Sequence, residues 1–229
     1  MSEHMALENL TVLDLTRVLA GPFCTMMLAD MGANVIKIEV PKGGDDTRSY
    51  PPFRAKNLNG ERESVYFANI NRNKKGITLN LKAPEGKEIF KELVKKADIV
   101  VENYRPGVMD KLGLGYDVLK EINPRIIYAA VSGFGCYGPY HLRPGYDILA
   151  QAMGGMMSIT GSKGGEPTRA GSALGDILGG LHVTIGILAA VNARTITGKG
   201  QRVDVSLMDS MIAATENTAL KYIETGNIP

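Results

Sequence analysis

Short runs of β-branched and aliphatic residues alternate along this chain with amphipathic stretches of helical period. The short runs predict six strands, at residues 11–15, 34–38, 77–81, 99–101, 125–131 and 202–205. The stretches between and after them predict helices at residues 24–31, 84–97, 116–122, 146–153, 177–194 and 206–224. Strands and helices therefore alternate over almost the whole length.

This alternation favours βαβ units and hence an α/β fold. We expect a Rossmann-like, doubly wound, largely parallel six-stranded sheet with helices on both faces. Ligands of such sheets bind at the carboxyl ends of the strands. Two loops, residues 40–63 and 133–145, are too long and polar for plain connections, and we expect both to border a site.

Composition narrows the classes of partner. The chain has 229 residues, 44% of them hydrophobic, which is ample for a buried core. A net charge of +2 makes nucleic acid or an anionic membrane surface a poor guess for the partner. The first ten residues lack the basic and apolar regions of a secretory signal, so we expect a cytoplasmic protein. The apolar tract 177–193 contains His182, Thr184 and Asn192 and suits a buried helix better than a membrane span.

Several common active sites find no support. The segment 133–138 spells G-x-G-x-x-G, but Pro139 and Pro144 follow, so no helix opens there to bind a pyrophosphate. Those glycines suit tight turns or close backbone approach. Three scattered histidines and two distant cysteines make no recognisable triad, disulfide framework or metal site, and we expect no metal.

The most unusual local sequence is GSALGDILGG, residues 171–180, in which Asp176 stands at the start of a long apolar helix. In one interpretation Asp176 is only a favourable first-turn residue, with Gly179 and Gly180 allowing close helix packing. In the other, the positive helix end holds the carboxylate ionised, and the missing side chains at 175, 179 and 180 admit an electrophile. Asp176 then acts as a covalent nucleophile. Spacing alone favours the first interpretation.

Residues 10–223 resemble the class III CoA-transferases, the group that includes formyl-CoA and carnitine-CoA transferases. The similarity runs in order through residues 12–39, 71–88, 97–116, 143–155, 175–180 and 197–210. It implies an acyl-CoA:carboxylate CoA-transferase that works through a covalent aspartyl-CoA thioester. Asp176 matches the nucleophilic aspartate of the family.

The resemblance also implies the ligands and their contacts. Coenzyme A is a substrate, carried by an acyl-CoA donor, and not a permanent cofactor; the acceptor is a carboxylic acid. The implied coenzyme A contacts are Leu19, Val40, Leu79, Lys82, Asn103, Tyr104, Arg105, Lys111, Arg143 and Tyr146. The basic members of this set suit the phosphates of coenzyme A, whereas Leu19 and Val40 suit its adenine or pantetheine.

Two departures from the family pattern matter. Related racemases carry a histidine as acid/base where this chain has Tyr146, and tyrosine is a weak base at neutral pH, so a transferase is preferred. The family's small domain and returning C-terminal segment have no counterpart here, so residues 1–229 are expected to be the N-terminal portion of the large CoA-binding domain. The full-length form is expected to be an interlocked homodimer, or to pair with a C-terminal polypeptide. An acyl-CoA racemase or epimerase and a non-catalytic CoA-binding fragment stay open as alternatives.

Overall fold

The computed structural model describes residues 4–54, 60 and 62–227. Its main sheet has six strands in the order β5-β2-β1-β6-β7-β8, and all neighbouring strands are parallel. The strands are β1 (Thr11–Asp14), β2 (Asn34–Glu39), β5 (Lys75–Thr78), β6 (Ile99–Glu102), β7 (Ile127–Ser132) and β8 (Arg202–Ser206). The expected doubly wound parallel sheet is confirmed.

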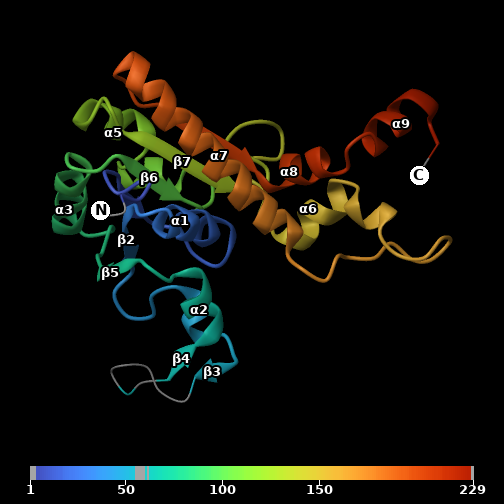
Figure 1. The fold of residues 1–229 in the computed structure, drawn as a ribbon, viewed down its shortest axis with the longest axis horizontal. Helices are drawn as coiled ribbons and strands as arrows, with labels where there is room; N and C mark the ends of the chain where they lie inside the picture. The colour runs from blue at the N-terminus through green and yellow to red at the C-terminus, as the bar shows by residue number, and fades with distance from the viewer. Residues whose placement is uncertain (1–3, 55–59, 61, 228–229) are drawn as a thin grey trace.

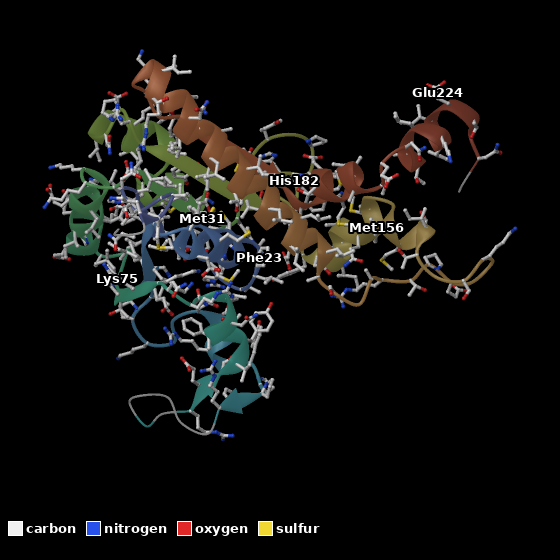
Figure 2. The ribbon with its side chains drawn as sticks, viewed as in Figure 1. Phe23, Met31, Lys75, Met156, His182 and Glu224 are labelled. Atoms are coloured by element: carbon white, nitrogen blue, oxygen red, sulfur yellow. The ribbon has the colours of Figure 1, made fainter. Side chains whose placement is uncertain are left out.

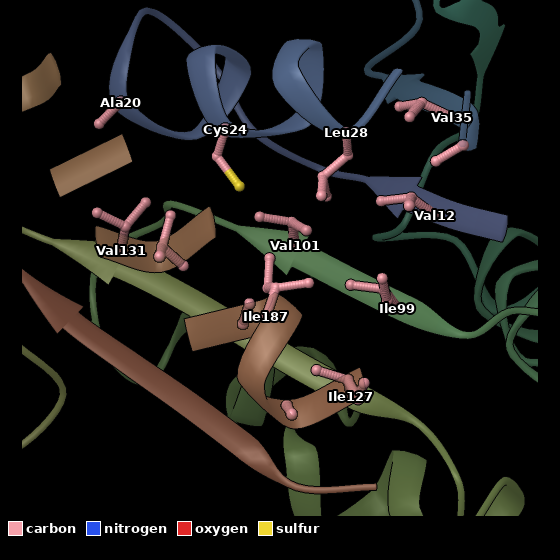
Figure 3. Close-up of a cluster of buried hydrophobic side chains, with 14 of the residues drawn as sticks. Val12, Ala20, Cys24, Leu28, Val35, Ile99, Val101, Ile127, Val131 and Ile187 are labelled. Carbon is pink, nitrogen blue, oxygen red and sulfur yellow. The ribbon is translucent and has the colours of Figure 1, made fainter. Parts of the chain in front are cut away.

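Helices cover both faces of this sheet (Figure 1). One face carries α1 (Ala20–Asp30), α7 (Leu174–Thr197) and α8 (Leu207–Ala214); the other carries α3 (Pro84–Val94), α4 (Val108–Leu112) and α5 (Tyr116–Ile122). Successive strand residues supply the two cores, because side chains alternate between faces. Ile99 and Val101 face α1, where Figure 3 shows Cys24 and Leu28, whereas Val100 faces the opposite core.

A small subdomain lies beside the sheet, at the bottom of Figure 1. It contains the 3-10 helix η1 (Asp46–Ser49), the antiparallel hairpin of β3 (Phe53–Arg54) and β4 (Glu63–Ser64), and α2 (Val65–Ile70). It occupies most of the region expected to be a long loop, of which residues 55–59 and 61 lie outside the described residues. The sequence pattern predicted neither this hairpin nor α2 and α4, because each is too short for a periodic signal.

The strand expected at residues 77–81 is displaced toward the N-terminus. β5 ends at Thr78, and Leu79 retains only a backbone hydrogen bond from its N–H to the Glu39 carbonyl, 2.8 Å long. Asn80 then turns the chain, since its carbonyl accepts from Ala83 N and its side-chain oxygen accepts from Lys82 N. This Asx-type turn ends the strand and leads into α3.

The single helix expected at residues 206–224 is divided into α8 and α9 (Thr218–Thr225). Glu216 between them has a φ of 52°, in the left-handed region, so the helical hydrogen-bond ladder cannot continue through it. The Thr215 hydroxyl donates back to the Ile212 carbonyl over 2.7 Å and helps to end α8. Glu224 of α9 consequently lies far from the sheet in Figure 2.

The remaining helices position the candidate site. α6 (Asp147–Met153) packs against α7 and α8 and is followed by the 3-10 helix η2 (Met156–Ile159). α7 is long and apolar enough to cross a membrane by length and composition, a test that core helices also pass. Residues along one side of α7, among them Val183, Ile187 and Ala190, are fully buried in the core that it shares with α1. This packing accounts for its apolar character.

Candidate active site

The sheet order creates a topological switch point between β1 and β6. From β1 the chain moves outward to β2 and β5 and then returns to β6 on the other side of β1. Connections that leave adjacent strands in opposite directions open a crevice at their carboxyl ends. A pocket of about 510 Å³ lies there, between the turn after β1 and the loop after β6. Its lining also includes residues from the end of β7, from the start of α8, from the loop before α6 and from α7.

Asp176 lines this pocket from the first turn of α7. Its carboxylate is partly buried, and within the described part of the chain it forms no hydrogen bond or ion pair. Burial, and next the nearby charge of Asp147, raise the pKa of Asp176 to about 6, against a smaller opposing effect of Arg169. The shift is opposite to the one expected from the helix end alone. At pH 7 a carboxyl with this pKa is still mostly ionised.

The glycines around Asp176 serve packing. A Cβ on Gly180 would stand 2.7 Å from the Ala20 carbonyl oxygen of α1, and a Cβ on Gly179 would stand 2.5 Å from Leu207. The interpretation that they allow close helix packing is confirmed. The expectation that they, with Gly175, leave room for an electrophile is wrong, because protein atoms already occupy the space beside each of them. Open volume lies at the Asp176 side chain itself.

Asp147 anchors the N-terminus of α7 from beneath. Its carboxylate accepts from the Gly175 N–H over 2.8 Å, from the Gln151 side-chain amide over 2.9 Å and from Arg169 Nε over 3.2 Å. This helix-cap arrangement fixes the residue directly before Asp176. The sequence analysis singled out Tyr146 but missed Asp147, although the two residues are adjacent.

Two close backbone approaches shape the pocket wall formed by the loop 133–146. A Cβ on Gly133 would stand 2.3 Å from Gly145 Cα, so glycine at both positions lets the two ends of the loop touch. This contact brings Arg143 and Tyr146 to the end of β7, and both line the pocket. No helix begins directly after residues 133–138, since the next one, α6, starts at Asp147, in keeping with the rejection of a dinucleotide motif.

Of the residues expected to contact coenzyme A, a majority lie together. Those that line the pocket with Asp176 are Leu19, Asn103, Tyr104, Arg105, Arg143 and Tyr146. Those outside its lining are Val40, Leu79, Lys82 and Lys111. Val40 and Leu79 follow β2 and β5 at the same edge of the sheet, Lys82 precedes α3, and Lys111 lies in α4. The role of each in binding remains a prediction.

The turn after β1 has an unusual backbone that sequence reasoning missed. Val18 has a φ of 66°, rare for a β-branched residue and typical of functional turns. The buried Asp45 carboxylate accepts from the Val18 N–H over 3.3 Å and from Lys37 Nζ over 3.0 Å. Lys37 also donates to the Thr16 carbonyl over 2.8 Å. A buried ion pair therefore holds the pocket turn from below.

Arg17 connects this turn to its neighbours across the pocket. Its side chain pairs with Asp46 over 2.7 Å, and its backbone exchanges two hydrogen bonds with the Asn103 side chain, of 2.8 and 2.7 Å. Tyr66 of α2 lies close enough to Asp176 for that charge, after burial, to contribute to raising its pKa to about 12. Only the folded structure brings Arg17, Asn103 and Tyr66 together, since they are distant in sequence, so no sequence motif could have grouped them.

This fold and site define a parallel α/β protein with a partly buried carboxylate at a switch-point pocket. The chain matches the family model for CoA-transferase family III over residues 7–229, and it belongs to that family. It is similar to an acyl-CoA transferase of Fusarium pseudograminearum, with 49% identity over 98% of this chain and 50% of that protein. Its identity to a succinyl-CoA:mesaconate CoA-transferase of Haloarcula marismortui is 47%, over 98% of this chain and 57% of that protein.

A solved structure has the same fold. The CaiB/BaiF family protein from Brucella suis has a TM-score of 0.94 and 44% identity, and the match covers 99% of this chain and 60% of that one. The human succinyl-CoA:glutarate CoA-transferase is 46% identical over 97% of this chain and 50% of its own length. The chain thus spans about half the length of the curated relatives it matches.

Proposed function

We propose that this chain provides the coenzyme A pocket and the nucleophile of an acyl-CoA:carboxylate CoA-transferase. The observation that most directly supports this proposal is that Asp176 lines one pocket with six of the residues predicted to contact coenzyme A. Relatives named as CoA-transferases for mesaconate and glutarate support a short-chain carboxylic acid as acceptor and succinyl-CoA as a donor to test. Arginines at 17, 105 and 143 in the same lining suit phosphate and carboxylate groups.

The proposed reaction starts and ends with one thioester and passes through mixed anhydrides between them. The ionised Asp176 attacks the donor acyl carbonyl, and the C–S bond breaks. Coenzyme A leaves as a thiolate, and a mixed anhydride between the donor acid and Asp176 remains. The thiolate then attacks the aspartyl carbonyl, which releases the donor acid and leaves an aspartyl-CoA thioester. The acceptor carboxylate attacks this thioester, which forms a second mixed anhydride and expels the thiolate. The thiolate then attacks the acceptor carbonyl and forms the acceptor acyl-CoA. Asp176 is regenerated as a carboxylate, with no net proton transfer.

The electrostatic setting of Asp176 supports this role. A carboxylate in full contact with water is a weak nucleophile, whereas a partly desolvated one without hydrogen bonds is more reactive. A pKa of about 6 still leaves most of the group ionised at neutral pH. Tyr146 occupies the position of the racemase histidine and is 69% exposed in the pocket lining, which supports a binding role in preference to proton abstraction.

The test is capture of the intermediate. The chain is incubated with succinyl-CoA and no acceptor, and intact mass is recorded before and after addition of hydroxylamine. We expect a mass gain of one coenzyme A less water, mapped to the peptide of Asp176, and conversion to a hydroxamate. Asp176→Asn should show no gain, whereas Asp117→Asn, an exposed acid on α5, should react normally. An adduct on another residue, or none with the relatives' donors, would contradict the proposal.

Assembly is a second part of the proposal. Large aliphatic side chains are exposed along α7 and α9, with Ile196 81% and Ile223 70% exposed. Apolar surface of this kind is typical of interfaces. We propose that a second copy or the C-terminal half of a full-length protein covers it. Light scattering of the chain, alone and with the C-terminal half of a relative, tests this; a monomer in both samples would contradict it.

A further inference from the structure

Glu102 is a buried carboxylate that the proposed chemistry does not use. It is the last residue of β6 and is 6% exposed. One of its oxygens accepts from the Tyr104 backbone N–H over 2.7 Å, and the other accepts from the Tyr128 hydroxyl over 3.1 Å. Both oxygens of the ionised form are therefore engaged, one by the pocket wall and one by β7.

The hydrogen bond to Tyr104 acts on the wall of the candidate active site. Asn103, Tyr104 and Arg105 all line the pocket and directly follow Glu102. Asn103 is fixed on its outer side by the two hydrogen bonds to the Arg17 backbone. On its inner side the Asn103–Tyr104 peptide is fixed by Glu102. The wall is thus held from two sides, by the turn after β1 and by one buried carboxylate.

The groups that surround Glu102 come from three directions. Tyr128 faces it from β7, Arg202 and Asp204 from β8, and Cys136 from the loop after β7. Asp110 of α4 lies on the far side of Tyr128 and acts on that phenol.

Burial raises the pKa of Glu102 to about 7. Asp204 adds to this effect, whereas the hydrogen bonds from Tyr104 and Tyr128 and the charge of Arg202 oppose it. The carboxyl thus changes protonation state near neutral pH.

We propose that Glu102 is a positioning residue whose ionised carboxylate holds residues 103–105 in the geometry that binds coenzyme A, so that protonation of Glu102 weakens binding. A protonated carboxyl keeps one good acceptor and gains an O–H donor, whereas both of its present partners are donors. One of the two hydrogen bonds must then be lost or reversed. This inference rests on the proposed function, since it concerns the same pocket.

Two conservative variants separate this role from a merely structural one. Glu102→Gln stays neutral at every pH; its amide oxygen accepts from Tyr104 and its amide nitrogen donates to the Tyr128 oxygen. Tyr128→Phe removes one donor that favours the ionised form of Glu102, so it raises the pKa of Glu102. Glu102→Gln should abolish the part of the pH response that comes from Glu102, and Tyr128→Phe should move the midpoint of that part to higher pH.

The first measurement follows the Tyr104 backbone amide by NMR in the 229-residue chain between pH 5.5 and 8.5. In the unaltered chain its proton should titrate with a midpoint near 7, because the charged acceptor is lost there. The titration should be absent in Glu102→Gln and shifted upward in Tyr128→Phe. A Tyr104 amide that does not titrate, or that titrates with the same midpoint in Glu102→Gln, would overturn the inference.

The second measurement is coenzyme A affinity by calorimetry at pH 8 and pH 6. Loss of one charge-assisted hydrogen bond in the wall is expected to weaken binding about fivefold more in the unaltered chain than in Glu102→Gln. Titration of the ligand phosphate and of Asp176 is common to both proteins and cancels in the ratio. If the unaltered chain fails to bind at pH 8, the proposed function is contradicted. If it binds but both proteins share one pH dependence, the positioning role alone is contradicted.

Discussion

Two carboxylates at the same edge of the sheet, Asp14 and Asp176, stand in opposite electrostatic surroundings. Burial alone would raise the pKa of Asp14, but Lys74 and Lys37, with hydrogen bonds from Thr16 and Thr25, lower it overall. Lys74 Nζ lies 3.0 Å from the Asp14 carboxylate, and both side chains are almost fully buried. Asp176 has no such partner among the described residues, and its pKa is raised.

The comparison separates a carboxylate that is paired within the fold, Asp14, from the one proposed to react, Asp176. A carboxylate saturated by donors and a cation is stabilised in its charged form and has little free electron density to offer. A buried carboxylate without donors is destabilised in its charged form, and either protonation or reaction with an electrophile removes this unfavourable free energy. The β1 side of the pocket is therefore rigidly paired, whereas Asp176 on the α7 side has no hydrogen-bond partner among the described residues, as the proposed nucleophile requires. Four predictions follow this contrast, from the largest expected effect to the smallest.

The largest effect is expected from Asp14→Asn. Removing the charge leaves Lys74 buried without its counterion, which typically costs about 3–5 kcal/mol. The free energy of unfolding from urea titration at pH 7 should fall by that amount. Because the folded pKa of Asp14 is lowered, its contribution is present above its ordinary pKa and is lost on acidification, so the loss should shrink below about pH 4. Asp117→Asn, at the surface, should change stability by less than about 0.5 kcal/mol.

Asp176→Asn is expected to raise the free energy of unfolding, whereas Asp14→Asn lowers it. A pKa raised from 3.8 to about 6 means that the ionised group destabilises the folded state, by up to about 3 kcal/mol above pH 6. The neutral amide removes this cost, so the variant should be more stable than the unaltered chain at pH 7.5. The gain should decline as pH falls through 6 and vanish below about pH 4. Urea titrations across this range would detect it, and a variant less stable at pH 7.5 would contradict the assignment.

The contact between α7 and α1 gives the third prediction. Gly180→Ala places a methyl group against the Ala20 carbonyl oxygen, where α7 must shift, at a cost of about 1–3 kcal/mol. Gly171→Ala is the matched control, because nothing lies within 4 Å of its added Cβ. Thermal unfolding should separate the two variants. Equal stability of both would mean that the helices do not approach as closely as described.

The smallest effect concerns the tuning of Asp176 by its neighbours. Adduct formation should lose rate as pH falls through about 6, since only the carboxylate attacks. Arg169→Gln removes a cation that lowers the pKa of Asp176, so the midpoint should move to higher pH and the rate at pH 6 should fall about twofold. Asp147→Asn should move the midpoint the other way. Rapid-quench measurement of the adduct by intact mass gives both midpoints, and shifts in one direction for both variants would contradict the electrostatic account.

Periodicity alone was enough for the fold class. Alternation of apolar strands and amphipathic helices reflects which faces are buried, and burial is a local property of each segment. It located the main strands within a few residues, yet it misplaced β5, where an Asx turn ends the strand, and it missed the break at Glu216, which depends on a left-handed residue with no sequence signal.

The candidate site likewise has features that the sequence predicts and features that only the folded structure shows. Asp176 was identifiable from its unusual neighbours and from the family resemblance, because both are properties of consecutive residues. Only the tertiary structure decided the direction of its pKa shift, the protein atoms that fill the space beside its glycines, and the contacts of Asp147 and Glu102. Each depends on groups from other elements within a few ångströms, and electrostatic and steric effects act through space, without regard to separation along the chain.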